Sequence, residues 1–426
     1  MERLEKAYLA GWEPARRAPP PPGLPDLEES LGELKELALS AGAQVVGASL
    51  QRSPGPDPAT LVGRGKVQEI RRQARAAEAD LVVFDSDLSP TQLRNLEQAL
   101  DLKVLDRTQL ILDIFARRAR SREGQLQVEL AQLNYLLPRL AGHGTWLSRL
   151  GGGIGTRGPG EQQLEYDRRR IRTRIRVLGK AIERVRAQRA LHRARRRDQQ
   201  FRTVALVGYT NAGKSTLFNA LTSAQVPTSS RLFATLDPTV RALPLASHQP
   251  ALLSDTVGFI RKLPPHLVAA FRATLEELED ASLLLHVTDA SDPRHESQDA
   301  AVEELLQTLE IASTPRLHVW NKIDLVDETE CGRLAQGDGG VAVSARTGDG
   351  LDLLLCRIDA SLETDPLVDA EFALSPADGE CLALLHRAGS VLATRFEDDC
   401  IRVRARVRTS LRERLKAASW SAPTNR

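Results

Sequence analysis

The chain has 426 residues, a formal net charge of +2 and 42% hydrophobic residues, which is enough material for several domains of ordinary size. Its four cysteines show no Cys-x2-Cys pairing, which argues against a disulfide framework or a zinc site and favours a reducing compartment. Apolar runs fall short of the roughly 18 residues that span a bilayer. We therefore expect a cytoplasmic protein without integral membrane contact.

The N-terminal part of the sequence predicts a short tail and a small α/β domain. Residues 1–25 end in a proline-rich run, residues 18–25, and are interpreted as an extended tail outside the core. Residues 26–120 alternate apolar runs at 43–50, 81–84 and 103–105 with helical patterns at 28–41, 65–79 and 91–99. This alternation predicts a parallel sheet covered by helices.

Residues 121–198 predict a basic helical hairpin. Leucines 126, 130, 133 and 137 recur at helical spacing, and a second apolar series follows at 164, 171, 175, 178, 182 and 185. The glycine-rich stretch 151–160 would join the two helices. Residues 157–197 contain 15 Arg or Lys and four acidic residues, so positive charge is concentrated here.

The second half of the chain predicts a nucleotide-triphosphatase domain over residues 201–364 and a small α+β domain over 371–426. Apolar runs at 203–207, 251–253, 282–287, 317–320 and 341–343 suggest five parallel strands. The last segment predicts a helix near 379–387, a hairpin across 391–407 turning at 397–399, and a helix from Ser410. The expected fold class is thus α/β, built around a P-loop GTPase domain.

A phosphate-binding loop follows the first of these strands, with the sequence Gly208-Tyr209-Thr210-Asn211-Ala212-Gly213-Lys214-Ser215-Thr216. Glycines let the backbone N–H groups face inward and hold an anion at the start of the next helix. Lys214 would reach the β- and γ-phosphates, and Ser215 would bind Mg²⁺.

Further motifs occur in the order that a guanine-nucleotide hydrolase requires. Asp255-Thr256-Val257-Gly258 follows a strand, with Asp255 placed to bind Mg²⁺ through water and Gly258 to sense the γ-phosphate. Thr235 is assigned as the switch threonine that closes over Mg²⁺, with Thr239 as the alternative. The predicted catalytic residues are Lys214, Thr235, Asp255 and Gly258, and the predicted protein ligands of Mg²⁺ are Ser215 and Thr235.

Base recognition is predicted at Asn321-Lys322-Ile323-Asp324. Asp324 offers a carboxylate to N1–H and the exocyclic amine of guanine, donors that adenine does not present together. This selects GTP over ATP. Asn321 and Lys322 would support the pocket, and Ser344-Ala345-Arg346 would close its far side.

Two positions depart from the usual GTPase pattern. Phe259 stands where many guanine-nucleotide switches place a glutamine that orients water, so slow intrinsic hydrolysis and a stimulating partner are expected. Asn211 suits two roles: it is a residue type that helps some GTPases bind K⁺ beside the phosphates, and it also suits the turn geometry of the loop.

The basic segment points to a polyanionic partner. Tyr166 is the only aromatic ring between residues 157 and 197, so stacking on single strands is disfavoured and phosphate and shape recognition of folded RNA fits better. Arg402, Arg404, Arg406 and Arg408 alternate with apolar residues and are expected on a solvated strand face.

Several long strings of sequence resemble the HflX family of ribosome-associated, translational GTPases. They are residues 57–67, Asp106-Arg107-Thr108 with 111–116, 126–133, 151–161 and 255–263, and the resemblance covers roughly 43–364. It implies docking on the large (50S) ribosomal subunit and its rRNA, with 57–67 and 151–161 as contacts. It also implies ribosome-stimulated GTP hydrolysis and the splitting or rescue of 70S ribosomes under stress.

Other readings of the sequence stay open. The protein could instead be a GTP-regulated RNA-binding scaffold that does not act on intact ribosomes, or a GTPase in small-molecule or tRNA modification. The latter lacks a Cys, His or acidic constellation in residues 26–120 to support it. We expect no DNA partner and a monomer.

Overall fold

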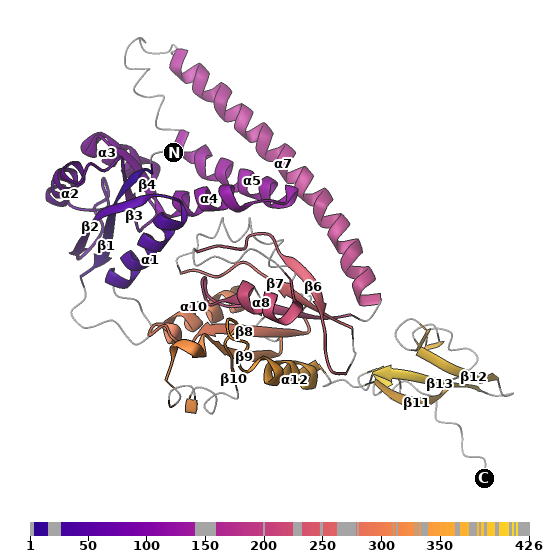
Figure 1. The fold of residues 1–426 in the computed structure, drawn as a ribbon. Helices are drawn as coiled ribbons and strands as arrows, with labels where there is room; N and C mark the ends of the chain where they lie inside the picture. Colours follow the sequence, from indigo (N-terminus) through magenta and orange to yellow (C-terminus); the bar gives the residue numbers. More distant parts are fainter. Residues whose placement is uncertain are drawn as a thin grey trace.

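The computed structural model describes residues 4–15, 27–140, 159–198, 201–224, 232–247, 250–261, 278, 281–309, 311, 314–327, 329, 332–333, 340–362, 367–374, 381–382, 385–386, 390–396, 400–408, 411–412 and 415, with side chains of 165–189 only in the second long helix. Three separate sheets of four, six and three strands organise the described chain (Figure 1). The α/β fold class expected from the sequence is confirmed.

The N-terminal domain is a parallel sheet of order β2-β1-β3-β4. Its strands are β1 (Lys6–Pro14), β2 (Gln44–Ser53), β3 (Leu81–Phe84) and β4 (Lys103–Asp106). Its helices are α1 (Leu27–Ser40), α2 (Arg64–Ala76), α3 (Pro90–Leu100) and α4 (Arg107–Arg118). The start of α3 shows why the boundaries fall there, since Ser89 and Gln92 form a reciprocal capping box and Pro90 occupies the first turn.

The interpretation of residues 1–25 as a tail outside the core is wrong for β1. Residues Ala7 to Ala10 are at most 3% exposed, and β1 pairs with β2 on one side and β3 on the other. The physical reason is that a central parallel strand needs a buried, nearly continuous apolar run, which Ala7-Tyr8-Leu9-Ala10 supplies before the prolines begin. The domain therefore includes residues on both sides of the proline-rich segment.

Two helices, α5 (Arg122–Arg139) and α7 (Pro159–Asp198), lie side by side beyond α4 (Figure 1). Leu178 and Ile182 of α7 are buried, whereas the leucines at 126, 130, 133 and 137 of α5 are only half-buried. The fully buried face of α5, which includes Val128, Ala131 and Tyr135, joins the core shared with α4. The glycine-rich stretch Gly151–Gly158 lies outside the described residues.

The central domain holds a six-stranded sheet of order β10-β9-β8-β5-β7-β6. The strands are β5 (Arg202–Val207), β6 (Thr239–Leu243), β7 (Ala251–Asp255), β8 (Leu283–Asp289), β9 (Arg316–Asn321) and β10 (Val341–Ala342). Helices α8 (Lys214–Thr222), α10 (His295–Thr308) and α12 (Leu351–Leu362) accompany them, with a short 3₁₀ turn η2 (Ile323–Leu325). The five predicted parallel strands are present, but β6 was missed and pairs antiparallel to β7 at the edge.

The C-terminal strands form an antiparallel sheet of order β11-β13-β12, from β11 (Leu367–Leu374), β12 (Ser390–Phe396) and β13 (Ile401–Arg408). The predicted start at residue 371 is too late because β11 begins at Leu367. Ile401, Val403, Ala405 and Val407 are buried, and Arg402, Arg404 and Arg406 are exposed, as expected. The turn at 397–399 and most of the two expected helices lie outside the described residues.

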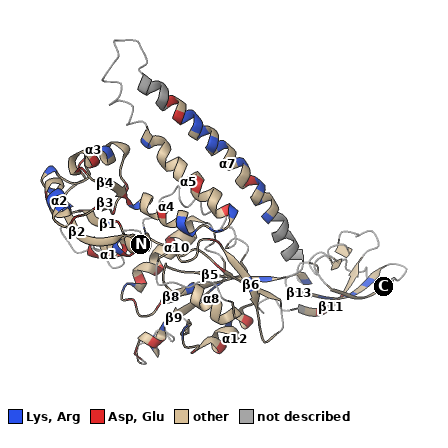
Figure 2. Ribbon diagram, turned by 45° about the horizontal axis from the view of Figure 1, so that its top comes forward, with Lys and Arg blue, Asp and Glu red and all other residues tan. Residues whose placement is uncertain are grey.

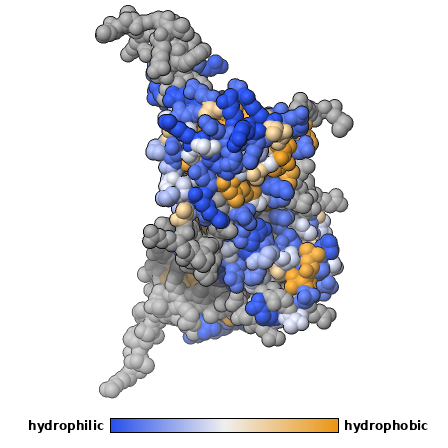
Figure 3. Space-filling view, turned by 90° about the vertical axis from the view of Figure 1, so that its left-hand side faces the viewer, coloured by the Kyte–Doolittle hydropathy of each residue, from blue (hydrophilic) through white to orange (hydrophobic). Residues whose placement is uncertain are grey.

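Arginines and lysines occupy much of the described length of α7 (Figure 2). The face of the molecule seen from the left of Figure 1 is mainly hydrophilic, with smaller hydrophobic areas (Figure 3). Within the residues that the structure describes, no helix combines the length and the apolar character needed to cross a bilayer.

Candidate nucleotide-binding site

The phosphate loop connects β5 to α8 and depends on two glycines. Gly208 (φ 149°) passes so close to β8 that a β-carbon would lie 2.2 Å from the carbonyl oxygen of Val287. Gly213 (φ 92°) would place a β-carbon 2.2 Å from Nδ2 of Asn321. Both positions adopt backbone angles that other residues avoid, so the close turn requires glycine.

Lys214 begins α8 and is 6% exposed. Its ammonium group donates to the backbone oxygens of Gly208 (3.0 Å) and Tyr209 (2.6 Å). Burial lowers the pKa of Lys214 to about 8, because the desolvated cation is only partly compensated by Asp255. An anion placed in the loop would supply the missing countercharge.

Ser215, Thr235 and Asp255 converge although they come from a helix, a loop and a strand end. The Ser215 hydroxyl lies 2.7 Å from Thr235 Oγ1 and donates to Asp255 Oδ2 at 2.7 Å, and Thr235 donates to the same oxygen at 3.0 Å. Asp255 Oδ1 is buried without a hydrogen-bond partner among the described residues. Burial raises the pKa of the Asp255 carboxyl, so this oxygen favours a proton or a cation.

The loop after β7 lies against the phosphate loop. The Phe259 N–H donates to the oxygen of Gly208 (3.1 Å), and the Thr210 N–H donates to the oxygen of Phe259 (2.8 Å). A β-carbon on Gly258 would lie 3.0 Å from the Lys214 ammonium nitrogen, so Gly258 adjoins the same space as Lys214. The Phe259 ring is buried in the hydrophobic core and offers no polar atom to a water molecule.

The predicted base-recognition residues lie together at the ends of β9 and β10. Asn321 donates from Nδ2 to the oxygen of Ala212 (2.9 Å) and accepts from the Ala345 N–H at Oδ1 (3.0 Å), which joins both loops. The Asp324 carboxylate accepts from the Ser344 hydroxyl (2.7 Å) and pairs with Arg346 (2.6 Å). Its position is thereby defined before any base arrives.

A cavity of about 300 Å³ lies over the phosphate loop. Its lining comprises Thr210, Asn211, Gly213, Lys214, Ser215, Thr216, Phe233, Ala234, Thr256, Gly258 and Lys322. Among the predicted residues, Ala212 and Val257 are buried in hydrophobic cores and do not line this space. The prediction missed Asp289, which holds the Lys322 ammonium group at 2.6 Å. Its place at the carboxyl end of β8 could have indicated it, because ligands of open α/β sheets bind at the carboxyl ends of the strands.

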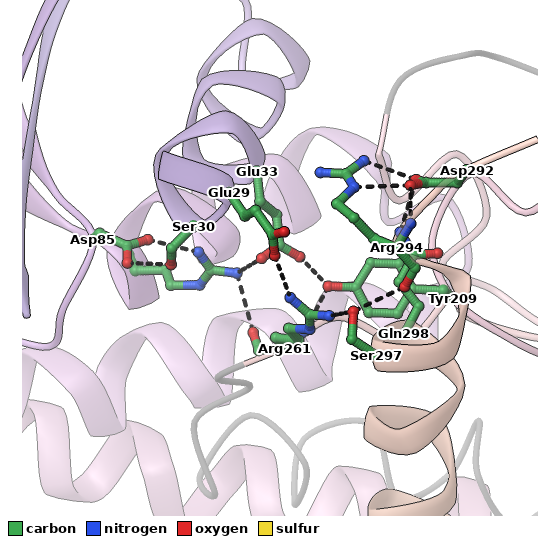
Figure 4. A network of polar contacts seen from close by, with 11 residues as sticks. Glu29, Ser30, Glu33, Asp85, Tyr209, Arg261, Asp292, Arg294, Ser297 and Gln298 are labelled. Atoms are coloured by element: carbon green, nitrogen blue, oxygen red, sulfur yellow. Dashed lines mark hydrogen bonds and ion pairs between the residues drawn. The ribbon is translucent and has the colours of Figure 1, made fainter. Parts of the chain in front are cut away.

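Tyr209 differs from its expected role, because its side chain turns from the cavity toward the N-terminal domain (Figure 4). Its hydroxyl donates to Glu33 of α1 and accepts from the Arg261 N–H at 3.1 Å. Arg107 of α4 pairs with Glu33 (2.9 Å) and donates to the oxygen of Arg261 (3.1 Å). The phosphate loop and the loop after β7 are thus joined to α1 and α4.

A phosphate loop between a strand and a helix, a strand-end aspartate beside it and an Asn-Lys-x-Asp pocket define a GTPase of the P-loop class. Family models agree over three successive regions. They match "GTP-binding GTPase N-terminal" over residues 28–116, "GTP-binding GTPase Middle Region" over 118–196 and "50S ribosome-binding GTPase" over 203–322.

Curated relatives narrow the class to one family. The chain is 48% identical over 392 residues to GTPase HflX of Caldanaerobacter subterraneus subsp. tengcongensis, covering 92% of this chain and 90% of the relative. It is 49% identical to GTPase HflX of Magnetococcus marinus (87% and 86% covered) and 44% identical to that of Escherichia coli K12 (87% and 88%). The chain belongs to the HflX family of GTPases and is a GTP-hydrolysing enzyme.

Proposed function

We propose that this GTPase acts on the large (50S) ribosomal subunit and that its GTP hydrolysis serves to split or rescue 70S ribosomes under stress. The observation that carries the proposal is the arginine-rich exposed surface of α7, in a protein whose nucleotide site lacks a polar side chain at Phe259. The description of the matched family as a 50S ribosome-binding GTPase supports the same partner.

The nucleotide would be held by groups already in place. Lys214 exchanges its two backbone partners for phosphate oxygens, and the Gly258 N–H faces the terminal phosphate. Asp324 accepts from the guanine N–H groups, while Asn321 holds the two loops at a fixed separation through Ala212 and Ala345. Binding therefore requires Lys214 to change its hydrogen-bond partners, while Asn321 keeps its two backbone partners.

Mg²⁺ fits the cluster formed by Ser215, Thr235 and Asp255. Two hydroxyls and a carboxylate are hard oxygen ligands of the kind this ion prefers, and the orphaned Asp255 Oδ1 is a buried acceptor that a hydrated ion could satisfy. When bound, the ion neutralises negative charge on the phosphates. Ser215 and Thr235 would bind it directly and Asp255 through water.

K⁺ binding beside the phosphates is proposed at Asn211. Asn211 lines the cavity and has φ 65°, an angle that asparagine adopts more easily than most residues. Turn geometry is therefore one sufficient reason for its presence, and K⁺ binding is a second. Equal hydrolysis rates in KCl and NaCl at one ionic strength would reject the K⁺ role.

A stimulating partner follows from the geometry around Phe259. Its ring is 4% exposed and its backbone N–H and oxygen are both committed to the phosphate loop. The residue cannot orient a water molecule without rearrangement of this loop, so we expect slow basal hydrolysis and acceleration when a partner supplies the positioning. Fast turnover by the isolated protein would contradict this expectation.

The ribosome is proposed as that partner because α7 and the segment 57–67, a loop that leads into the first turn of α2, present suitable surfaces. In α7, Arg169, Arg172 and Arg176 are exposed, and Tyr166 is the exposed aromatic ring. In the loop, the Asp57 carboxylate accepts from the backbone N–H groups of Ala59 (2.8 Å) and Thr60 (3.1 Å). These hydrogen bonds give the loop a defined shape. Charged helices and shaped loops suit folded RNA.

The proposal is tested by steady-state GTP hydrolysis with and without large ribosomal subunits, in a K⁺ buffer of constant ionic strength. Strong stimulation is expected, and it should fall when Arg169 and Arg176 are changed to Glu. The matched control changes Arg357 and Arg404 to Glu, since both are exposed on other domains and alter the net charge equally. Absence of stimulation in the unaltered protein would reject the ribosome as activator.

The alternative of a GTP-regulated RNA-binding scaffold predicts a different outcome. Free structured RNA should then compete with ribosomes for the protein in a pelleting assay, because the charged face of α7 would be sufficient for binding. Docking on the large subunit predicts poor competition. In that case, dissociation of 70S ribosomes by the GTP-bound protein becomes the decisive measurement.

A further inference from the structure

Asp237 joins the loop that carries Thr235 to the first turn of α5. Its Oδ2 accepts from the backbone N–H groups of Arg120 (2.9 Å) and Ser121 (2.8 Å), and its Oδ1 accepts from the Ser121 hydroxyl. Ser121 is also the N-cap of α5 and accepts from the Gly124 N–H at 2.9 Å. A carboxylate at a helix N-terminus is stabilised by the unpaired N–H groups there.

The same loop is held at two more points by the N-terminal domain. The Leu232 N–H donates to the Ser40 hydroxyl at the end of α1 (2.9 Å). The Phe233 ring packs edge-on against Phe115 of α4, with centroids 4.6 Å apart. Only one residue, Leu236, separates Asp237 from Thr235, whose hydroxyl lies 3.0 Å from Asp255 Oδ2.

We infer that Asp237 is a positioning residue for GTP hydrolysis: it couples the start of α5 to the placement of Thr235 beside Ser215 and Asp255. A displacement of α5 would pull Asp237 and carry Thr235 away from the cation-binding cluster. The two long helices would then control hydrolysis from outside the nucleotide pocket. This inference rests on the proposed role of Thr235.

Gly124 provides a way to disturb this link from the helix side. A β-carbon at Gly124 would lie 2.5 Å from Asp237 Oδ1, so an alanine there displaces the carboxylate. Alanine also favours helix over glycine. The Gly124→Ala variant therefore perturbs Asp237 while strengthening α5, which separates loss of positioning from loss of folding.

The experiment measures single-turnover GTP hydrolysis and GTP affinity for the full chain and its variants. Gly124→Ala and Asp237→Asn should lower the hydrolysis rate by about tenfold to 100-fold, as expected for a small displacement of a reacting group, with affinity nearly unchanged. Gly179→Ala is the matched control, because Gly179 lies within α7 and a β-carbon there would meet no atom within 4 Å. Its rate should equal that of the unaltered protein.

A double-mutant cycle with Thr235→Ala identifies the route. If Asp237 acts through Thr235, adding Asp237→Asn or Gly124→Ala to Thr235→Ala causes no further loss. Additive losses, or an unchanged rate in Gly124→Ala while Thr235→Ala is slow, would overturn this inference alone. An unchanged rate in Thr235→Ala would instead overturn the proposed role of Thr235, and this inference with it.

Discussion

The side chain of Asn321 occupies the space that a β-carbon on Gly213 would need, at 2.2 Å from Nδ2. Asn321 reaches this position because its amide bridges Ala212 and Ala345, the two loops on either side of the nucleotide pocket. The glycine of the phosphate loop and the asparagine of the base-recognition motif are therefore fitted to each other, although they belong to separate motifs.

The first prediction follows from this fit. Gly213→Ala should abolish measurable GTP binding, because the new methyl group must displace Asn321 and disrupt both loops. Gly348→Ala is a matched control, since Gly348 has nearly the same backbone angle (φ 94° against 92°) but no atom within 4 Å of a β-carbon. Titration with a fluorescent guanine nucleotide compares them. The Gly348→Ala variant should bind the nucleotide as the unaltered protein does. Equal affinities of the two variants would show that the contact with Asn321 does not account for the effect of Gly213→Ala.

Asp324 should determine the choice of base. Asp324→Asn replaces one of the two carboxylate acceptors of the guanine N–H groups by an NH2 donor and removes the negative charge. Loss of charge-assisted hydrogen bonds of about 1.5–3 kcal/mol then weakens GTP binding by roughly tenfold to 100-fold. Xanthosine triphosphate, which presents an oxygen in place of the amine, should bind this variant better than the unaltered protein. Competition binding tests both nucleotides, with Asp352→Asn on α12 as control. An unchanged preference would remove Asp324 from base recognition.

The buried charge of Arg107 should be important for stability. Its guanidinium is paired with Asp85 (2.8 Å) and Glu33 (2.9 Å), and Arg107 is 1% exposed. Arg107→Ala leaves the Asp85 and Glu33 carboxylates without their shared positive charge, which costs about 3–5 kcal/mol for a buried pair. Chemical unfolding measures the loss. Arg406→Ala, which breaks an exposed pair with Asp369, should cause little change.

Phe115 should hold the loop around Phe233 in place. Phe115→Ala removes one ring of an edge-on pair and opens a cavity, at a cost of about 3–5 kcal/mol in a core that cannot close. Hydrogen exchange of the amides at 232–237 should accelerate in this variant. Phe115→Leu fills most of the volume and should protect these amides better. Equal exchange in all three proteins would show that the loop is held elsewhere.

Most of the central domain was predictable because its signals are local. Each apolar strand is short, and all but the one at 282–287 are followed by a predicted motif, so these strands and their loops could be predicted from single stretches of sequence. The edge strand β6 was not predicted because its five residues mix apolar and polar types. Its antiparallel pairing with β7 cannot be recognised from its own sequence. In β11, the alternation over Leu367–Leu374 was present but overlooked after Pro366.

The contacts between domains could not be predicted in the same way. Tyr209 and Glu33 are 176 residues apart, and Asp237 and Ser121 are 116 residues apart. Nothing near Tyr209 distinguishes a phosphate-loop residue that faces the nucleotide from one that faces another domain. The direction in which such a side chain faces depends on which surfaces meet after each domain has folded. Periodicity and motif spacing do not contain this information.

The position of β1 has a consequence for the biosynthesis of this protein. The strand is made before β2 and β3, between which it lies; α1 separates it from β2, and α2 follows before β3. At roughly 5–20 residues per second, both edges of a hydrophobic strand stay unpaired for on the order of ten seconds. Unpaired strand edges invite pairing with other chains. β1 therefore needs shielding from other chains while β2 and β3 are being made.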